Sequence, residues 1–145
     1  MNADDHTLGL GRLMGNLQSL EATIRIFLTW TDPSKNYIIS RDTFGPLVQK
    51  YNDQLANNEP YSIDQQVVTI RNALAHGLVF APSNMSPPLI LNMSLPLNLN
   101  MSLPLTLFHD DLSYEMTVGW FQDQQTLVQD QINHVVACAQ KRGIS

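Results

Sequence analysis

Hydrophobic residues recur along four stretches of the sequence at intervals of three and four positions, which places them on one face of an α-helix. The first stretch predicts a helix from about Thr7 to Trp30, with three early glycines that let another helix approach closely. The second predicts a helix from about Arg41 to Ala56, with Ser40 as a candidate N-cap. The expected inward positions are Leu10, Leu13, Met14, Leu17, Leu20, Ile24, Phe27 and Leu28 in the first helix and Phe44, Leu47, Val48, Tyr51 and Leu55 in the second.

A third and a fourth helix follow in the second half of the chain. The third is expected to begin at a cap formed by Ser62 or Asp64 and to end at Gly77 in a left-handed cap. The fourth is expected from about Thr117 to Lys141. A chain of 145 residues suits one hydrophobic core. The pattern therefore predicts a single all-α domain over residues 1–145, in which four helices pack as a bundle.

Between the third and fourth helices, the pattern changes to an eight-residue repeat over residues 83–106. From Leu89 to Leu107 every odd position is Leu or Met, while the even positions are mostly Asn, Ser, Pro or Thr. Alternation with a period of two is typical of a strand with one buried face. Pro96 and Pro104 cannot donate ladder hydrogen bonds, so any strands are expected at a sheet edge. The sequence predicts a β-hairpin-like or irregular insertion over about 80–115.

The charge of the chain is low and acidic. Charged residues make up 14%, and the formal net charge is −5 with only eight Lys and Arg. Proteins that hold duplex nucleic acid on a broad basic face need more cations than this, whereas a cleft that contacts one or two phosphates does not. The many uncharged polar residues are compatible with a surface buried against a second copy of the chain.

No export signal, membrane span or metal-ligand spacing is recognised in the sequence. The N-terminus is acidic where a secretory signal is basic, and no stretch reaches the ~18 apolar residues of a membrane span. The single cysteine, Cys138, cannot form an internal disulfide and is expected to be buried and inert. His6, His109 and His134 are expected at the surface. These features predict a cytoplasmic protein that uses neither a metal nor a cofactor and does not contact the membrane.

One segment near the end of the third helix combines side chains suited to phosphodiester chemistry. Arg71 offers a permanent cation with a planar fork of donors for phosphate, and an imidazole such as that of His76 can take or give a proton. Asn72 shares a helix face with His76, whereas Arg71 and His76 are about 140° apart. The set fits metal-independent RNA cleavage, in which His76 activates the ribose 2′-hydroxyl or protonates the leaving 5′-oxygen. A histidine from a second copy would complete the acid–base pair.

Structural roles can also account for these residues. Cations near a helix C-terminus are favoured by the helix dipole, so Arg71 and His76 need no function to occur there. Glu21 is a weak candidate as a binding partner of Arg71. It also lies four residues before Arg25, and the intrahelical pair Glu21–Arg25 is the expected outcome.

The octet Ile70–Gly77, with the sequence Ile-Arg-Asn-Ala-Leu-Ala-His-Gly, resembles the signature of the HEPN superfamily, named for higher eukaryote and prokaryote nucleotide-binding domains. In that family an Arg, an adjacent polar residue and a His four to six residues after the Arg lie near the end of a helix. Looser similarity extends to Leu17–Glu21 and Glu115–Phe121, so the resemblance covers most of the chain outside the repeat. It implies an up-and-down four-helix bundle that usually forms a homodimer.

Many members of this superfamily are metal-independent ribonucleases of toxin–antitoxin, abortive-infection and other defence systems. By this resemblance, Arg71 binds phosphate, His76 acts as acid–base and Asn72 supports them, in a site completed at the dimer interface. The implied partners are an RNA substrate and an antitoxin or other defence protein. Some members have lost activity or only bind nucleotides, so a non-catalytic interaction or nucleotide-binding module is the alternative. A tyrosine that is modified in one subgroup is replaced here by Leu78.

Overall fold

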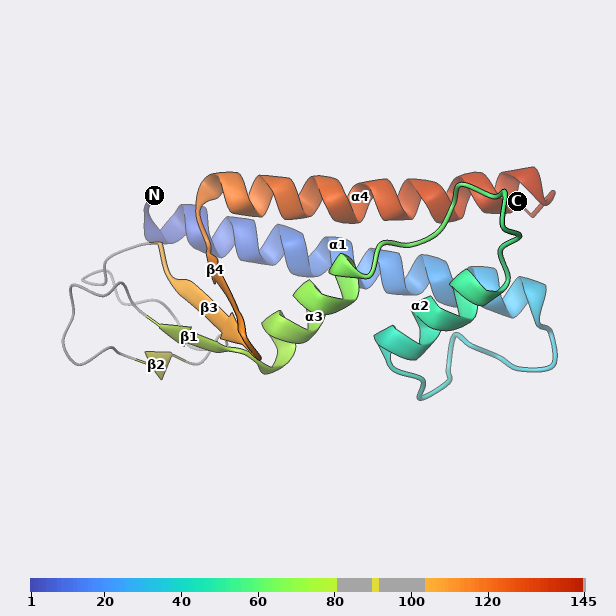
Figure 1. Cartoon of the computed structure of the whole chain (residues 1–145), viewed down its shortest axis with the longest axis horizontal. Coiled ribbons are helices and arrows are strands. Elements are labelled where there is room, and N and C mark those ends of the chain that lie inside the picture. The colour runs from blue at the N-terminus through green and yellow to red at the C-terminus, as the bar shows by residue number, and fades with distance from the viewer. Residues whose placement is uncertain (81–89, 92–103, 145) are drawn as a thin grey trace. The chain divides into compact units, whose positions relative to one another are not determined.

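The structure of the chain is a computed structural model that describes residues 1–80, 90–91 and 104–144. It is mainly helical, as the periodicity predicts, with helices α1 (Ala3–Thr31), α2 (Phe44–Asp53), α3 (Gln66–His76) and α4 (Val118–Lys141) (Figure 1). Among the described residues between α3 and α4 there are four short strands, β1 (Leu78–Phe80), β2 (Ile90–Leu91), β3 (Thr106–His109) and β4 (Leu112–Glu115). The strands fall where the sequence predicts a β-hairpin-like insertion rather than a helix.

The chain divides into two compact units whose boundaries fall inside α1, α3 and α4. Unit 1 comprises Met1–Met14 and Thr69–Gln125. Unit 2 comprises Gly15–Val68 and Thr126–Ser145. Unit 1 contains the small sheet and the segment from Arg71 to His76, whose residues the sequence analysis singles out as candidates.

The sheet of unit 1 is antiparallel, with the strand order β2-β1-β3-β4. Across β1 and β3, Leu78 lies opposite Phe108 and Val79 lies opposite Leu107. Val79 and Leu107 are buried, whereas Leu78 and Phe108 are partly exposed. One face of the sheet therefore packs into the unit, as expected where side chains alternate between two faces.

The structure confirms that an insertion with strands precedes the last helix. Within residues 104–115 of this insertion, β3 and β4 form a β-hairpin. The described residues Ile90–Leu91 form β2, an edge strand, as expected for this segment. The expectation is wrong for β3, which begins two residues after Pro104 and pairs with both β1 and β4. The remaining repeat positions, 83–89 and 92–103, lie outside the described residues.

A polar cap sets the start of α1, which lies four residues before the predicted one. The backbone N–H of Asn2 donates to Asp5 Oδ2 at 3.0 Å, and the backbone N–H of Asp5 donates to Asn2 Oδ1 at 2.8 Å. This reciprocal arrangement, a capping box, satisfies N–H groups that have no partner within the helix. Hydrophobic periodicity carries no information about such a cap.

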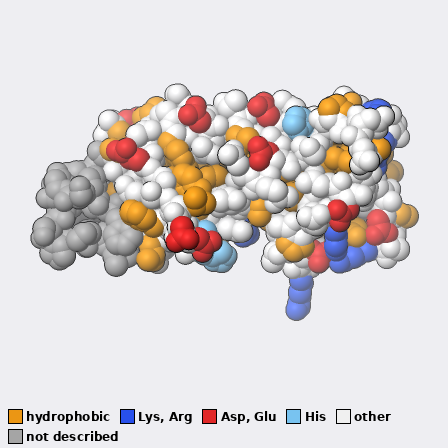
Figure 2. Space-filling view, viewed as in Figure 1, with side chains coloured by type: hydrophobic (Ala, Val, Ile, Leu, Met, Phe, Trp, Pro, Cys, Tyr) orange, Lys and Arg blue, Asp and Glu red, His pale blue; other side chains and the backbone are white. Residues whose placement is uncertain are grey.

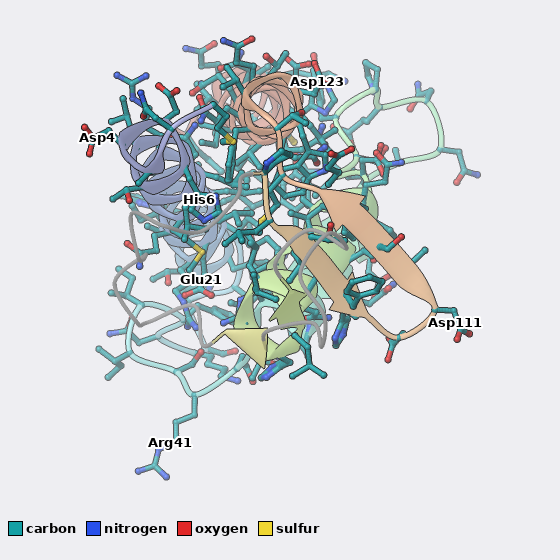
Figure 3. All side chains as sticks on the ribbon, turned by 90° about the vertical axis from the view of Figure 1, so that its left-hand side faces the viewer. Asp4, His6, Glu21, Arg41, Asp111 and Asp123 are labelled. Carbon is teal, nitrogen blue, oxygen red and sulfur yellow. The ribbon has the colours of Figure 1, made fainter. Side chains whose placement is uncertain are left out.

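The prediction that His6 lies at the surface is wrong. Its side chain is buried, with 3% exposed, and its ring meets the ring of Phe121 edge to face at a centroid distance of 5.5 Å. Figure 3 shows His6 pointing toward the interior of unit 1, while Asp4 points outward. Burial lowers the pKa of the His6 imidazole, since the charged form loses its hydration. Its Nδ1 has no hydrogen-bond partner among the described residues.

Gly9 permits the close approach of α1 and α4 within unit 1. A Cβ atom added at Gly9 would lie 2.6 Å from Cδ2 and 2.7 Å from Cγ of Phe121, a buried ring. The expectation that an early glycine allows tight packing is therefore confirmed at this position. It does not hold at Gly11 and Gly15, where an added Cβ meets no described atom within 4 Å.

Gly9→Ala is expected to lower the free energy of unfolding by about 1–3 kcal/mol, because the added methyl group overpacks Phe121. The matched control is Gly11→Ala on the same helix, which is expected to raise it by up to ~1 kcal/mol through better helix propensity. Denaturant unfolding of the three proteins measures both effects. If both substitutions stabilise the protein equally, the close approach at Gly9 is not a packing constraint.

In unit 2, one arginine organises the segment between α1 and α2. The Arg25 guanidinium donates to the backbone oxygens of Tyr37 at 2.6 Å, Ser40 at 3.1 Å and Asp42 at 2.6 Å. Ser40, the predicted N-cap of the second helix, accepts this bond instead, and Thr43 occupies the cap position without a side-chain bond. α2 consequently begins at Phe44, later than predicted.

The starts of the other two helices follow the predictions more closely. Asp64 Oδ1 accepts a hydrogen bond from the backbone N–H of Gln66 at 2.9 Å, so Asp64 rather than Ser62 caps α3. Thr117 Oγ1 accepts from the backbone N–H of Trp120 at 2.9 Å at the start of α4. Cys138 is buried in α4, as predicted.

Candidate functional site

The last turns of α3 place Arg71, Asn72 and His76 on the outer side of the helix. Residues 70, 73 and 74 are buried and define the inner side, whereas Arg71 and Asn72 are half-buried and His76 is exposed. At 100° per residue, the order across the outer side is Arg71, Ala75, Asn72 and His76. The helix therefore groups the three predicted site residues on one continuous surface, with Asn72 between the cation and the imidazole.

The polar groups of these three side chains have no protein partner in the described part of the chain. Within the part of the chain that the structure describes, Arg71, Asn72 and His76 form no side-chain hydrogen bond or ion pair. Arg25 in unit 2 shows the opposite behaviour, because its guanidinium is satisfied by three backbone oxygens. A guanidinium without such partners keeps all its donors for a ligand.

Glu21, the weakest of the predicted site residues, lies in unit 2. Its Oε2 is 3.4 Å from Arg25 Nε, which confirms the expected pair of residues four apart on one helix. Its carboxylate is therefore engaged by a structural arginine. The structure brings together Arg71, Asn72 and His76 within unit 1, and Glu21 is not part of that group.

Gly77 joins α3 to β1 through a contact that no other residue allows. A Cβ atom at Gly77 would meet the backbone oxygen of Ala73, lie 2.7 Å from the backbone oxygen of Phe108 and lie 2.8 Å from Leu107 Cδ1. The backbone of Gly77 also donates to the oxygen of Ala73 at 2.7 Å. The predicted left-handed cap is wrong, since among the described glycines only Gly143 has a positive φ. Glycine is required here for close approach, and it presses the end of α3 against β3.

The β3–β4 hairpin ends beside this junction. The strands turn at Asp110, whose φ of 51° lies in the left-handed region that tight turns use. His109 Nε2 lies 3.6 Å from Asp110 Oδ2, and the His109 side chain is 22% exposed. The position of His109 beside the end of α3 could not be predicted from residue spacing, because it depends on the pairing of β1 with β3.

Unit 1 is strongly acidic. Its sequence contains two Lys or Arg side chains, Arg12 and Arg71, against the six carboxylates of Asp4, Asp5, Asp110, Asp111, Glu115 and Asp123. On the face that Figure 2 shows, the acidic side chains lie in separate places and form no continuous patch. Figure 3 shows Asp4 and Asp111 at the periphery. Such a surface offers few cations to an RNA backbone, so phosphate contact at the end of α3 depends on Arg71.

Within residues 1–80, 90–91 and 104–144, no three His, Cys, Asp or Glu side chains are grouped to hold a metal ion. None of the helices in these ranges is both long and apolar enough to cross a bilayer. Comparisons with protein-family models, with curated proteins and with solved structures give no match to this chain.

Proposed function

We propose that this protein cleaves RNA without a metal ion, through Arg71, Asn72 and His76 on the outer side of α3. The observation that carries the proposal is that a guanidinium, a carboxamide and an imidazole lie together on one helix surface without structural partners among the described residues. Each of these groups suits one requirement of phosphodiester cleavage. The resemblance of Ile70–Gly77 to the HEPN signature supports the same assignment.

The chemistry divides between the three side chains. Arg71 neutralises the phosphate and stabilises the additional negative charge of the pentavalent transition state. His76 transfers a proton, either from the ribose 2′-hydroxyl or to the leaving 5′-oxygen. Asn72, between the two, orients the imidazole or donates to a phosphate oxygen. The nucleophile belongs to the RNA itself, so the reaction needs no activated water.

The proposal includes an assembly of two copies of the chain. In the HEPN superfamily the four helices form an up-and-down bundle and two bundles join at the Arg-His segments, and we propose the same arrangement here. The low proportion of charged residues, 14%, supports a surface that is buried against a second copy. We further propose that the partner is an antitoxin or other defence protein that covers Arg71 and His76 in the cytoplasm.

Replacement of Arg71 tests the proposal. The wild-type protein is expected to cleave single-stranded RNA in excess chelator. Arg71→Gln is expected to lower the rate about 10²–10³-fold, the loss typical when one hydrogen-bond donor to the transition state is removed. The matched control is Arg12→Gln, since Arg12 is the other cation of unit 1 and is exposed. The proposal is refuted by equal rates for the two variants, or by a wild-type protein that cleaves no RNA in chelator.

The acidic surface of unit 1 favours a second candidate, nucleotide binding without cleavage. Two cations among six carboxylates suit a single phosphate group better than a polymer with one charge per residue. Under this alternative, a mononucleotide raises the melting temperature of the wild-type protein but not of Arg71→Gln. No RNA is cleaved in that case.

A further inference from the structure

The proposed site needs two proton-transfer groups, and α3 supplies one. Cleavage by the 2′-hydroxyl requires a base for the attacking oxygen and an acid for the leaving oxygen, and His76 fills one of these roles at a time. The other described histidine near the end of α3 is His109, on the β3–β4 hairpin.

Strand register brings His109 to the end of α3. Leu78 lies opposite Phe108, so one further step along the antiparallel pair places Gly77 beside His109. The close contact between Gly77 and the backbone oxygen of Phe108 agrees with this extension. Since His76 is the neighbour of Gly77, the Cα atoms of His76 and His109 lie on the order of 10 Å apart. Two imidazole side chains can reach one phosphodiester across that distance.

The register also shows which face of β3 carries His109. An added Cβ at Gly77 meets Leu107 Cδ1 and the backbone oxygen of Ala73, so the last turn of α3 approaches the Leu107 face of β3. Alternate residues of a strand share a face, and His109 is two residues after Leu107. The side chain of His109 therefore projects on the side where α3 ends.

The local environment of His109 suits an acid–base residue. Its ring is neither fully buried nor fully exposed, at 22%, and Asp110 Oδ2 lies 3.6 Å from its Nε2. A carboxylate in this position helps to orient the imidazole ring. Asp111 lies in the same turn as Asp110, whereas Arg71 is on α3 and Glu115 is at the opposite end of the hairpin, paired with Thr106.

We infer that His109 is the second proton-transfer residue of the site and acts with His76 of the same chain on one RNA phosphodiester. The inference rests on the proposed function, and it replaces the histidine expected from a second copy. The 2′-oxygen forms a bond to phosphorus as its proton passes to one imidazole, and the bond from phosphorus to O5′ breaks as the other, protonated imidazole gives its proton to O5′. The products are a 2′,3′-cyclic phosphate and a 5′-hydroxyl, and exchange with water restores both imidazoles.

Kinetics of matched glutamine variants test the inference. His109→Gln is expected to lower the rate of RNA cleavage in chelator at least ~100-fold, as His76→Gln does, whereas His134→Gln in unit 2 retains the wild-type rate. An RNA in which sulfur replaces the scissile 5′-oxygen is expected to restore the rate of one of the two slow variants, because a thiolate leaves without a proton. The variant whose rate the sulfur substrate restores is the one that lacks the acid. A variant that is slow because it is unfolded would not be restored.

Imidazole NMR of the wild-type protein supplies a second measurement, which decides the matter if His109→Gln does not fold. Uridine 3′-monophosphate is expected to shift the ring signals of both His76 and His109 and to leave those of His134 unchanged. His109 takes no part in the reaction if His109→Gln cleaves at the wild-type rate and the His109 signal does not move. If His76→Gln is inactive in the same experiments, the proposed function stands without His109. If the wild-type protein does not cleave RNA, the proposed function and the inference both fail.

Discussion

His76→Gln is expected to lower the rate of RNA cleavage by about 10²–10⁴-fold while the protein remains folded, because the substitution removes a proton-transfer group. His76 is the last residue of α3 and is exposed, and its side chain has no hydrogen-bond partner in the described part of the chain. A surface change of this kind alters the free energy of unfolding by about 0.5 kcal/mol or less. The loss of rate is therefore chemical in origin.

Single-turnover cleavage in excess chelator and thermal unfolding of the same preparations measure this effect. His134→Gln is the control, because His134 carries the same side chain on α4 and its Nδ1 lies 3.0 Å from the backbone oxygen of Ser62. We expect it to cleave at the wild-type rate. If His76→Gln also does so, His76 takes no part in the reaction.

Gly77→Ala is expected to destabilise the protein by about 3 kcal/mol, near the upper end of the range for overpacked sites. The methyl group meets the backbone oxygens of Ala73 and Phe108, and neither can move without displacing α3 or β3. The same displacement separates His76 from the hairpin, so the cleavage rate is expected to fall even under conditions where the variant is folded.

Gly119→Ala is the matched control for this prediction within unit 1. Its added Cβ would lie 3.8 Å from Thr117 Oγ1, an ordinary contact, in the first turn of α4. We expect its free energy of unfolding to equal that of the wild type or exceed it by up to ~1 kcal/mol. Denaturant unfolding compares the three proteins, and similar stabilities for Gly77→Ala and the wild type would contradict a close approach of α3 to β3.

Hydrophobic spacing predicts the helices of this chain well because burial of one helix face is a local property of the sequence. Leu13, Leu17, Leu20 and Ile24 are all buried in α1, as their spacing predicts. The helix start at Asn2 and Asp5 was not predicted, since it depends on two polar side chains that follow no hydrophobic period.

Features that depend on residues distant in the sequence could not be predicted in this way. His6 was expected at the surface, but Phe121 of α4 covers its ring. Gly77 was expected to adopt a left-handed conformation, but the backbone of β3 determines its role. Strand pairing likewise places His109 near the end of α3, and no motif around His109 indicates it.

The candidate site was predicted in part. The spacing of Arg71, Asn72 and His76 shows which helix face they share once the helix is assigned, and the structure confirms that assignment. Their freedom from structural contacts could not be predicted, because it depends on what the neighbouring elements leave exposed. The partner of Glu21, in contrast, could be predicted, because Arg25 lies four residues later on the same helix.

The most direct test of RNA cleavage by the 2′-hydroxyl is a comparison of two substrates in excess chelator. One is an RNA with a mapped cleavage position, and the other carries a single 2′-deoxyribose on the 5′ side of that position. We predict that the wild-type protein cuts the first to a 2′,3′-cyclic phosphate and a 5′-hydroxyl and leaves the second intact. Cleavage of the second substrate at the same position and rate would contradict the account.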